Sequence, residues 1–390
     1  MSNNNKKILI INTKYRQLGG EDINILEEIN FLKEFYEVNY LEFQNKSKLT
    51  IRDLFYFLSL TNLDSNRRLQ QKLDEFKPDL VYINNTWFKG NLGLFEILRK
   101  NKINTILKIH NFRYHCTRYL TQNRHLNGDD SCKMCGMTLK KYSILNKYFS
   151  DSYLKSLAVL RYGKKYIKIL KKYPIHIFAL NNFHKNYLLD LGINKEKVSV
   201  SYNPVNFDSE IPKSILNQSD YVTYAGRISE EKGLNELLNA WRSSNIDDLK
   251  LKILGGGELL DSIKNKYERT NIQFLGLKTQ EETQSIIKNS LAVITATKMF
   301  EGQPRLLCEA SSFGVPSIFP RVGGLEEYFP NDYILSFEQF NYEDLKKKIN
   351  MLNNKKLVGE LGLQVFDFLN SKIQKDKLKQ NFDRVLSIEK

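Results

Sequence analysis

The chain has 390 residues, 41% of them hydrophobic, which suits two domains of ordinary size better than one core. No run of about 18 apolar residues predicts a membrane-spanning helix. The 59 Lys and Arg against 44 Asp and Glu give a net charge of +15, which favours anionic partners. No zinc-finger spacing, RNP-like strand motif or convincing helix-turn-helix accompanies this charge, so we expect no nucleic-acid partner.

The first predicted strand, KKILIIN, begins a series of short aliphatic or β-branched runs that alternate with amphipathic helical patterns. The same rhythm returns from DYVTYAG at residue 220 onwards. Strands separated by helices predict parallel sheets, so we expect two α/β domains in series. The apolar run near the N-terminus is short and lacks a small-residue cleavage site, so we expect no signal peptide.

Prolines and small polar residues interrupt the pattern at 198–214, where we place the join between the domains. The predicted domains are 1–205 and 206–390, and the first would carry a cysteine-bearing insertion near 112–140. The final helical segment, from about residue 356, could cross back to the N-terminal domain.

A glycine pair, Gly19 and Gly20, separates the first predicted strand from a helix that opens with acidic residues. A glycine turn at this place lets backbone N–H groups approach an anion, and the helix dipole favours negative charge there. The stretch is not GxGxxG, so a dinucleotide fingerprint is absent. A plain tight turn is the alternative.

In the second half, YAGRISEEKG places Arg227 and Lys232 between a strand and a helix. The two cations could neutralise a diphosphate, Arg227 through its forked guanidinium and Lys232 as a point charge. The alternative is a solvated turn, because Glu230 and Glu231 stand beside them. The first strand–helix crossing of an α/β domain is nonetheless where such folds bind ligands.

Two carboxylates lie in EGQPRLLCEASSFGVP, Glu301 in a loop and Glu309 in the helix that follows. Eight residues of helix would put them on one face, roughly 12 Å apart along the axis. That is too wide for a glycosidase pair but suits two parts of an extended polyhydroxy ligand, such as a nucleotide sugar. A surface Glu and a helix charge would be the explanation if the motif stood alone.

Together, the glycine loop, GRISEEKG and EGQPRLLCEASSFGVPSIFPRVGGLEE resemble the family-4 retaining glycosyltransferases. The resemblance extends over PDLVYINNTW, LKIHNFR, SYNPV, LKILGGGE and NIQFLG, nearly the whole chain. It implies the GT-B fold, an α/β architecture of two Rossmann-like domains that face each other across a cleft. The N-terminal domain would then bind the acceptor and the C-terminal domain the nucleotide sugar. Many relatives carry Pro after the glycines of LGGGELL, and that departure bears on recognition of the base.

By this resemblance, Arg227 and Lys232 would hold the diphosphate, Glu309 the ribose and Glu301 the donor sugar. His110 would lie near the anomeric centre, although a satisfied strand-end histidine is the alternative. The remaining donor-binding residues are expected to line the same pocket or close over the phosphates; they are Gly19, Gly20, Gly302, Gln303, Pro304 and Arg305.

The implied activity is a metal-independent, retaining hexosyl transfer from a UDP- or GDP-sugar, with no required cofactor. A non-catalytic GT-B scaffold, a GT-B epimerase and a phosphorylase are the alternatives. A phosphorylase would need a pyridoxal-phosphate lysine, which we cannot identify in the sequence.

Cys116, Cys132 and Cys135 have the spacing of three ligands in a tetrahedral zinc site. His110, His115 and His125 are nearby, and the sequence does not select the fourth ligand among them. The alternative is free thiols on a mobile loop, consistent with a reducing cytoplasm.

A basic segment, RYGKKYIKILKK, alternates cations with Tyr and aliphatic residues at 161–172. It favours an amphipathic helix on an anionic membrane, and the aromatic stretch at 51–60 would add apolar insertion. We therefore expect a cytoplasmic protein, peripheral on the inner face of the cell membrane. Its acceptor would be a lipid-borne polyprenyl-diphosphate saccharide or a diacylglycerol, in polysaccharide or glycolipid synthesis. A core-packing helix with a solvated lysine face is the alternative.

Overall fold

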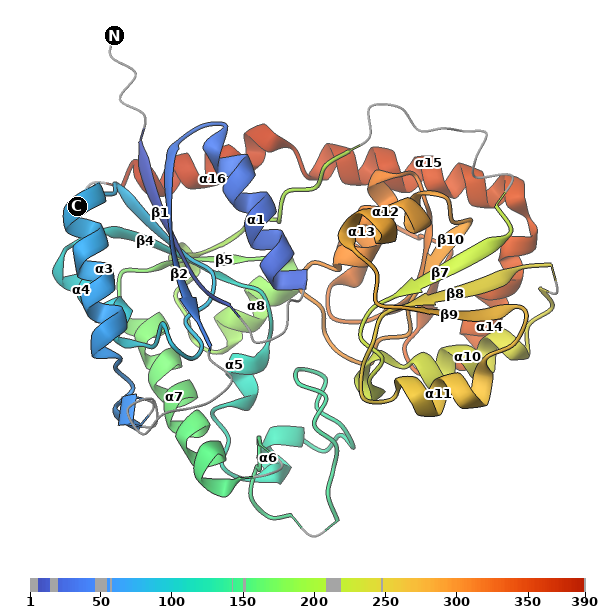
Figure 1. The fold of residues 1–390 in the computed structure, drawn as a ribbon, viewed down its shortest axis with the longest axis horizontal. Coiled ribbons are helices and arrows are strands. Elements are labelled where there is room, and N and C mark those ends of the chain that lie inside the picture. The colour runs from blue at the N-terminus through green and yellow to red at the C-terminus, as the bar shows by residue number, and fades with distance from the viewer. Residues whose placement is uncertain are drawn as a thin grey trace. The chain divides into compact units, whose positions relative to one another are not determined.

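The computed structural model describes residues 6–14, 20–45, 55–56, 58–141, 143–149, 152–207, 219–246 and 248–388. The chain divides into two compact units, one of Met1–Pro204 with Lys375–Lys390 and one of Val205–Gln374. Each unit is built on a parallel sheet of six described strands with helices packed on it (Figure 1). The expected two α/β domains are thus confirmed. No helix within the described ranges is long and apolar enough to span a bilayer.

The sheet of the first unit has the strand order β2-β1-β3-β4-β5-β6. Its central strands are continuous apolar runs because helices cover both faces of a parallel sheet, and Ile8–Ile11 are fully buried. Asn62 caps one of these helices, since its side chain accepts from the Asp64 and Ser65 amides. The strands are β1 (Lys7–Lys14), β2 (Glu37–Gln44), β3 (Leu80–Ile83), β4 (Asn104–Ile109), β5 (His176–Ala179) and β6 (Val198–Val200). The helices are α1 (Gly20–Lys33), α3 (Leu63–Phe76), α4 (Gly93–Lys100), α5 (Arg113–Cys116), α6 (Gln122–Leu126), α7 (Tyr153–Lys172), α8 (Asn182–Asp190), η1 (Lys195–Lys197) and α16 (Lys375–Leu386).

Helix α16 belongs to the first unit although it comes last in the chain. The Phe382 ring lies edge-on to the rings of Tyr82 and Phe178, with centroids 5.2 Å from each. The Tyr36 hydroxyl donates to Asp383 Oδ1 at 2.7 Å. The core of this unit is therefore built from both ends of the sequence.

A buried ion pair joins β4 to α1 in the same unit. Lys108 Nζ donates to the Glu28 carboxylate, and their side chains are only 1% and 4% exposed. The Tyr82 hydroxyl donates to the same carboxylate at 2.8 Å, and Lys108 also donates to the Tyr202 carbonyl at 3.1 Å. Both charges are thus paired and hydrogen-bonded, as buried charges must be to remain ionised.

The sheet of the second unit has the order β12-β11-β10-β7-β8-β9. In chain order this is the doubly wound arrangement, in which the path reverses direction between the first and fourth strands, β7 and β10. Ligands bind such sheets at the carboxyl ends of the two strands that flank the reversal. The strands are β7 (Tyr221–Ala225), β8 (Lys250–Leu254), β9 (Ile272–Gly276), β10 (Ala292–Ile294), β11 (Ser317–Arg321) and β12 (Ser336–Glu338). The helices are η2 (Glu230–Lys232), α10 (Leu234–Arg242), α11 (Leu260–Tyr267), α12 (Gln280–Lys288), α13 (Arg305–Ser312), η3 (Leu325–Tyr328), α14 (Tyr342–Asn350), η4 (Met351–Asn353) and α15 (Lys355–Lys372).

Candidate functional site

Two loops meet at the reversal point of the second unit, one after β7 and one after β10. The first runs through residues 226–233 and the second through residues 295–304. The Lys298 amide donates to the Glu231 carbonyl at 2.9 Å, which joins the loops backbone to backbone. Lys232 and Glu301 are 69 positions apart in the chain. The motifs that contain them, GRISEEKG and EGQP, are therefore neighbours in space.

Lys232 and Glu301 are direct partners in this region. Lys232 Nζ lies 2.5 Å from Glu301 Oε1, and the Thr297 hydroxyl donates to the same oxygen at 3.3 Å. The Lys232 and Glu301 side chains keep 23% and 26% of their surface exposed. Arg227 is more open, at 57%, and lies 3.6 Å from the Glu231 carboxylate. The loops thus present two cations and a carboxylate that a ligand can reach.

Glycine allows the backbones to approach this closely. Gly233 has φ +65°, and a Cβ there would lie 2.1 Å from the Ala296 carbonyl oxygen. Gly255, in LGGGE, has φ +135°, and a Cβ there would lie 1.9 Å from the Gly226 carbonyl oxygen. The Gly226 amide donates to the Leu254 carbonyl at 3.0 Å, which fixes the close approach between Gly226 and Gly255. The glycines therefore hold the Arg227 loop in place from two sides.

Glu309 lies inside α13 and has partners of its own. Arg305 Nη2 donates to Glu309 Oε1 at 2.6 Å, and Gln284 Nε2 donates at 3.3 Å. Both members of the Arg305–Glu309 pair are 17% exposed. The helical-rise argument for a 12 Å separation does not apply to this pair, because only Arg305–Ser312 is helical and Glu301 precedes the helix.

Gly302, Gln303 and Pro304 form the connection between the Glu301 loop and α13. Pro304 is the residue that caps the helix, with no side-chain hydrogen bond to the first turn. Proline disfavours helix at the residue before it, which explains why α13 starts where it does. These three residues therefore lie between the two predicted carboxylates, at the beginning of the helix.

A separate pocket lies in the first unit, at the carboxyl ends of β3 and β4, with a volume of about 120 Å³. Polar and aromatic side chains line it, including Asn84, His110, Arg113, Tyr148 and Tyr162. Of these, only His110 was predicted from the sequence as a site residue. The polar run NNTW directly after a buried strand was the available signal for Asn84, but nothing in the sequence placed Tyr148 beside it.

His110 is held in this pocket by a hydrogen bond between its Nε2 and Asn84 Oδ1, at 2.8 Å. Its buried Nδ1 has no protein partner among the described residues. Burial, with the charge of Lys108 and the neighbouring His184, lowers the pKa of His110 to about 3. The imidazole is therefore neutral at physiological pH, and Nδ1 is an acceptor for a hydroxyl group.

The remaining predicted residues fall in the first unit. Gly19 lies outside the described residues, and Gly20 is the first residue of α1. Cys116, Cys132 and Cys135 lie together, with His125 beside them. The fourth cysteine, Cys308, is buried in α13 of the second unit.

Part of the chain matches a family of glycosyltransferases. Residues 207–361 match the family model described as Glycosyl transferases group 1. The chain is 24% identical over 232 residues to an uncharacterized 41.2 kDa protein in the cps region of Klebsiella pneumoniae, covering 55% of this chain and 62% of that protein. It is 26% identical over 163 residues to the lipopolysaccharide 1,6-galactosyltransferase of Escherichia coli K12, covering 40% and 45%. The chain thus spans less than two thirds of these curated relatives.

Among solved structures, the chain is similar to Anabaena HepE in complex with UDP and glucose. The TM-score is 0.70 at 13% identity, and the match covers 98% of this chain and 99% of HepE. A match at this identity concerns the fold, and it extends over both units. The GT-B fold expected from the sequence is confirmed.

Proposed function

We propose that this chain is a glycosyltransferase that moves a hexosyl group from a nucleotide-diphosphate sugar to an acceptor hydroxyl, with retention of anomeric configuration. The observation that carries the proposal is the pairing of Lys232 with Glu301 at the reversal point of the second unit. The match of residues 207–361 to a glycosyltransferase family supports it, and so does the fold shared with a UDP-binding protein.

The second unit is proposed to bind the donor. Arg227 and Lys232 would contact the diphosphate, where a forked guanidinium and an ammonium neutralise phosphate oxygens. Glu309 would accept hydrogen bonds from the ribose hydroxyls and Glu301 from the sugar hydroxyls. Backbone groups from Gly302 to Arg305 would line the same pocket.

The first unit is proposed to bind the acceptor and to contribute contacts to the donor. His110 would accept a hydrogen bond from a donor sugar hydroxyl through Nδ1, because burial keeps the ring neutral. The loop containing Gly19 and Gly20 would contact the phosphates. Asn84 and Tyr148 line the same pocket as His110 and add further hydrogen-bonding groups for an acceptor sugar.

The proposed transfer breaks the bond between the anomeric carbon and the diphosphate oxygen. The acceptor oxygen forms its bond to the same face of that carbon, and its proton passes to the departing phosphate oxygen. Negative charge grows on the diphosphate as the bond breaks, so preorganised cations such as Arg227 and Lys232 stabilise the transition state more than the ground state. These steps need neither a side-chain nucleophile nor a metal ion.

The acceptor is proposed to be lipid-borne, as a polyprenyl-diphosphate saccharide or a diacylglycerol. One relative is named as a lipopolysaccharide galactosyltransferase, and α7 presents a face suited to a lipid surface. Tyr153, Leu154 and Leu157 are 55%, 80% and 47% exposed at the beginning of this helix. Six exposed cations follow along it: Arg161, Lys164, Lys165, Lys168, Lys171 and Lys172.

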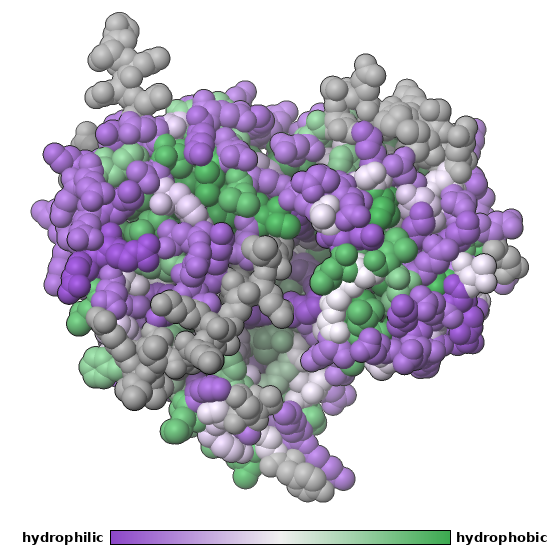
Figure 2. All heavy atoms as spheres, in the orientation of Figure 1, coloured by the Kyte–Doolittle hydropathy of each residue, from purple (hydrophilic) through white to green (hydrophobic). Residues whose placement is uncertain are grey.

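This α7 face has the composition of a peripheral membrane contact, with apolar side chains beside basic ones. Figure 2 shows hydrophobic residues exposed beside hydrophilic ones at the lower end of the first unit, where Figure 1 places α6 and one end of α7. Phe55 and Leu58, from the aromatic stretch, are 63% and 47% exposed; residues 51–54 and 57 lie outside the described residues. We propose that the protein acts at the cytoplasmic face of the membrane.

The test is incubation of the purified chain with a panel of UDP- and GDP-sugars and lipid-linked acceptors, followed by mass spectrometry of the products. A glycosylated acceptor with retained configuration is the expected result. An epimerised sugar or a sugar phosphate would contradict the proposal in favour of an epimerase or a phosphorylase. If the chain neither binds nor turns over any donor, a non-catalytic scaffold role is the remaining explanation.

A further inference from the structure

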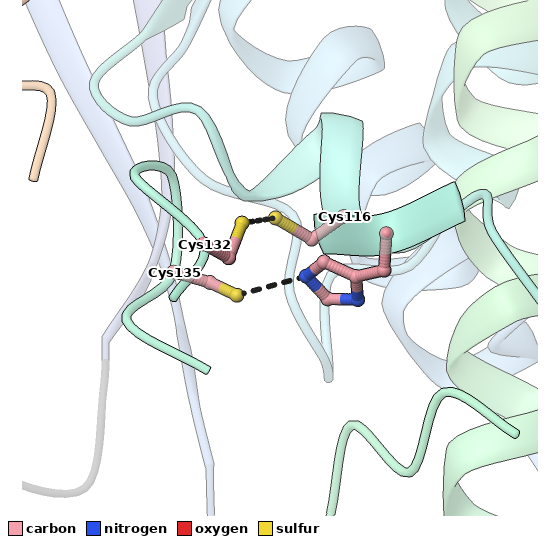
Figure 3. Close-up of side chains that lie close together, drawn as sticks. Cys116, Cys132 and Cys135 are labelled. Carbon is pink, nitrogen blue, oxygen red and sulfur yellow. Dashed lines mark hydrogen bonds between the residues drawn. The ribbon is translucent and has the colours of Figure 1, made fainter. Parts of the chain in front are cut away.

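Four potential metal ligands gather in the first unit, outside the pocket around His110. Cys116 ends α5, His125 lies on α6, and Cys132 and Cys135 belong to the turn that follows. One ligand atom from each residue lies within 4.8 Å of the others. Figure 3 shows the three cysteines and an imidazole pointing toward one another.

The distances fit one tetrahedral ion. Cys116 Sγ lies 3.4 Å from Cys132 Sγ, and His125 Nε2 lies 3.2 Å from Cys135 Sγ. Zinc bonds of ~2.3 Å to sulfur and ~2.0 Å to nitrogen give tetrahedral edges of roughly 3.8 and 3.5 Å. These two contacts are within a few tenths of an ångström of those values, and all four ligand atoms lie within 4.8 Å of one another. A disulfide would need about 2.05 Å between sulfurs, and all four cysteines are free.

The turn that carries two of the sulfurs is built for this arrangement. The Gly136 amide donates to the Cys132 carbonyl at 2.8 Å, and Gly136 has φ +74°, which closes the turn directly after Cys135. The Cys132 amide donates to the Met137 carbonyl, also at 2.8 Å. The backbone therefore fixes both sulfurs on one side.

The geometry selects among the three histidines that the sequence left open. His110 is bonded to Asn84 in the pocket. His115 Nδ1 contacts Arg118 Nη2 at 3.1 Å and the Tyr187 hydroxyl. Only His125 of the three directs a nitrogen at the sulfurs. Cys116, His125 and Cys132 are buried and Cys135 is partly buried, so the set has the closed character of a structural site.

The segment around the cluster has little else to hold it. Its hydrophobic cluster consists of Cys116, Leu126 and Cys132, with Met134, Met137 and Tyr148 among the residues packed against it. Regular structure among its described residues is limited to α5, α6 and two isolated bridges. A core this small usually needs a metal or a disulfide to be stable. Tyr148 and Thr117 of this segment also line the pocket around His110.

We propose that Cys116, His125, Cys132 and Cys135 bind a structural Zn²⁺ ion through three thiolates and Nε2 of the imidazole. The ion fixes the described residues of 113–141 and 143–148 and so holds one wall of the pocket. Four protein ligands leave no open position, so the zinc takes no part in bond making. The inference does not depend on the proposed transferase activity.

The experiment is elemental analysis of the full chain, purified without a metal-affinity tag and under reducing conditions. We expect about one zinc ion per chain. Replacement by Co²⁺ should give the visible absorption of a tetrahedral thiolate site, a signature that free thiols do not produce. Cys132→Ser should lose the metal, whereas the matched control Cys308→Ser, a buried cysteine of the second unit, should keep it.

Two further variants keep the proposal falsifiable if Cys132→Ser fails to fold. His125→Cys preserves four ligands and should retain zinc with a more intense thiolate-to-cobalt band, whereas His125→Ala should lose most of the metal. Zinc that persists in both Cys132→Ser and His125→Ala would overturn the assignment. So would a metal-free native chain, a Cys116–Cys132 disulfide under reducing conditions, or iron in place of zinc.

Discussion

Lys232 and Glu301 form an ion pair, with Nζ and Oε1 2.5 Å apart, although we assign them to different parts of the donor. A diphosphate that contacts Lys232 must therefore compete with a carboxylate that is already its partner. On the proposed assignment, Glu301 would become free to accept from sugar hydroxyls when the phosphate draws the ammonium away. The pair would then couple recognition of the two halves of a nucleotide sugar.

Glu301→Gln should separate these roles. It removes the carboxylate charge from Lys232, so UDP or GDP binding should be unchanged or tighter. Transfer should fall by at least roughly tenfold, because a hydrogen bond to a charged group is worth about 1.5–3 kcal/mol. Calorimetry with the nucleotide and a transfer assay measure the two effects. If Glu301→Gln loses nucleotide as badly as Glu309→Gln, the assignment of the two carboxylates is wrong.

Lys232→Ala should weaken nucleoside-diphosphate binding by about 1.5–3 kcal/mol, since it removes a charged contact to phosphate. Lys298→Ala is the matched control, because Lys298 is similarly buried, at 19% exposed, and pairs with Glu236 at 2.7 Å in the same region. Calorimetry on both variants makes the comparison. Equal losses would point to a general charge effect and not to a phosphate ligand.

The buried Lys108–Glu28 pair should be costly to break from one side. Lys108→Met leaves the Glu28 carboxylate buried without its cation, and we expect a loss of about 3–5 kcal/mol in stability. The double variant Lys108→Met with Glu28→Met should recover part of the lost stability, because neither buried charge remains. Urea unfolding of the two variants tests this. A double variant less stable than the single one would contradict the explanation.

Stability should fall as the pH drops below about 6.5. Burial lowers the pKa of His184 to about 3, and it lowers the pKa of His110 to about 3 as well. Between the folded and unfolded pKa values, the unfolded chain binds protons that the folded chain excludes. Each histidine then lowers the free energy of unfolding by up to ~1.4 kcal/mol for each pH unit that the pH falls. Unfolding free energies from pH 7.5 to 5 should decline less steeply in His184→Gln, and an unchanged slope would refute the role of that group.

Binding to anionic vesicles should depend on the α7 face and decrease with salt, because exposed charges are screened beyond roughly 8 Å at physiological ionic strength. Vesicle sedimentation at low and high salt is the measurement. The test variant replaces five exposed lysines of α7 by Gln: Lys164, Lys165, Lys168, Lys171 and Lys172. The control removes the same charge from exposed lysines of the second unit: Lys266, Lys278, Lys347, Lys355 and Lys356.

Only the α7 variant should lose vesicle binding. Equal loss in both variants would indicate an effect of net charge alone. If the unmodified chain does not sediment with anionic vesicles at low salt, the membrane contact is refuted.

The fold was predictable because its signals are local. KKILIIN becomes β1, and alternating runs of this kind specify parallel sheets wherever helices cover both faces. The Lys232 loop was found because its residues are adjacent in sequence. The fourth ligand of the cysteine cluster could not be identified from the sequence, because three histidines lie at plausible distances along the chain. Only the folded backbone directs one of them, His125, toward the cysteines.

The helical argument for the carboxylate spacing did not hold, for a related reason. Counting residues between Glu301 and Glu309 assumes one continuous helix, but Pro304 lies between them and the helix starts after it. Tyr148 was missed because it reaches the pocket from a segment without regular secondary structure, where no periodicity predicts direction. Long-range placement of this kind depends on tertiary packing, which local patterns do not record.

The place of α16 has a consequence for synthesis of the protein. Phe382 and Asp383 complete the packing of Tyr82 and Tyr36, yet they leave the ribosome after all of Val205–Gln374. At a synthesis rate of about 5–20 residues per second, the second unit takes roughly 10–35 s to make, and α16 is added to the first unit only after that time. During that interval the surface that receives Phe382 lacks its partner, so the core of the first unit is completed only when translation ends.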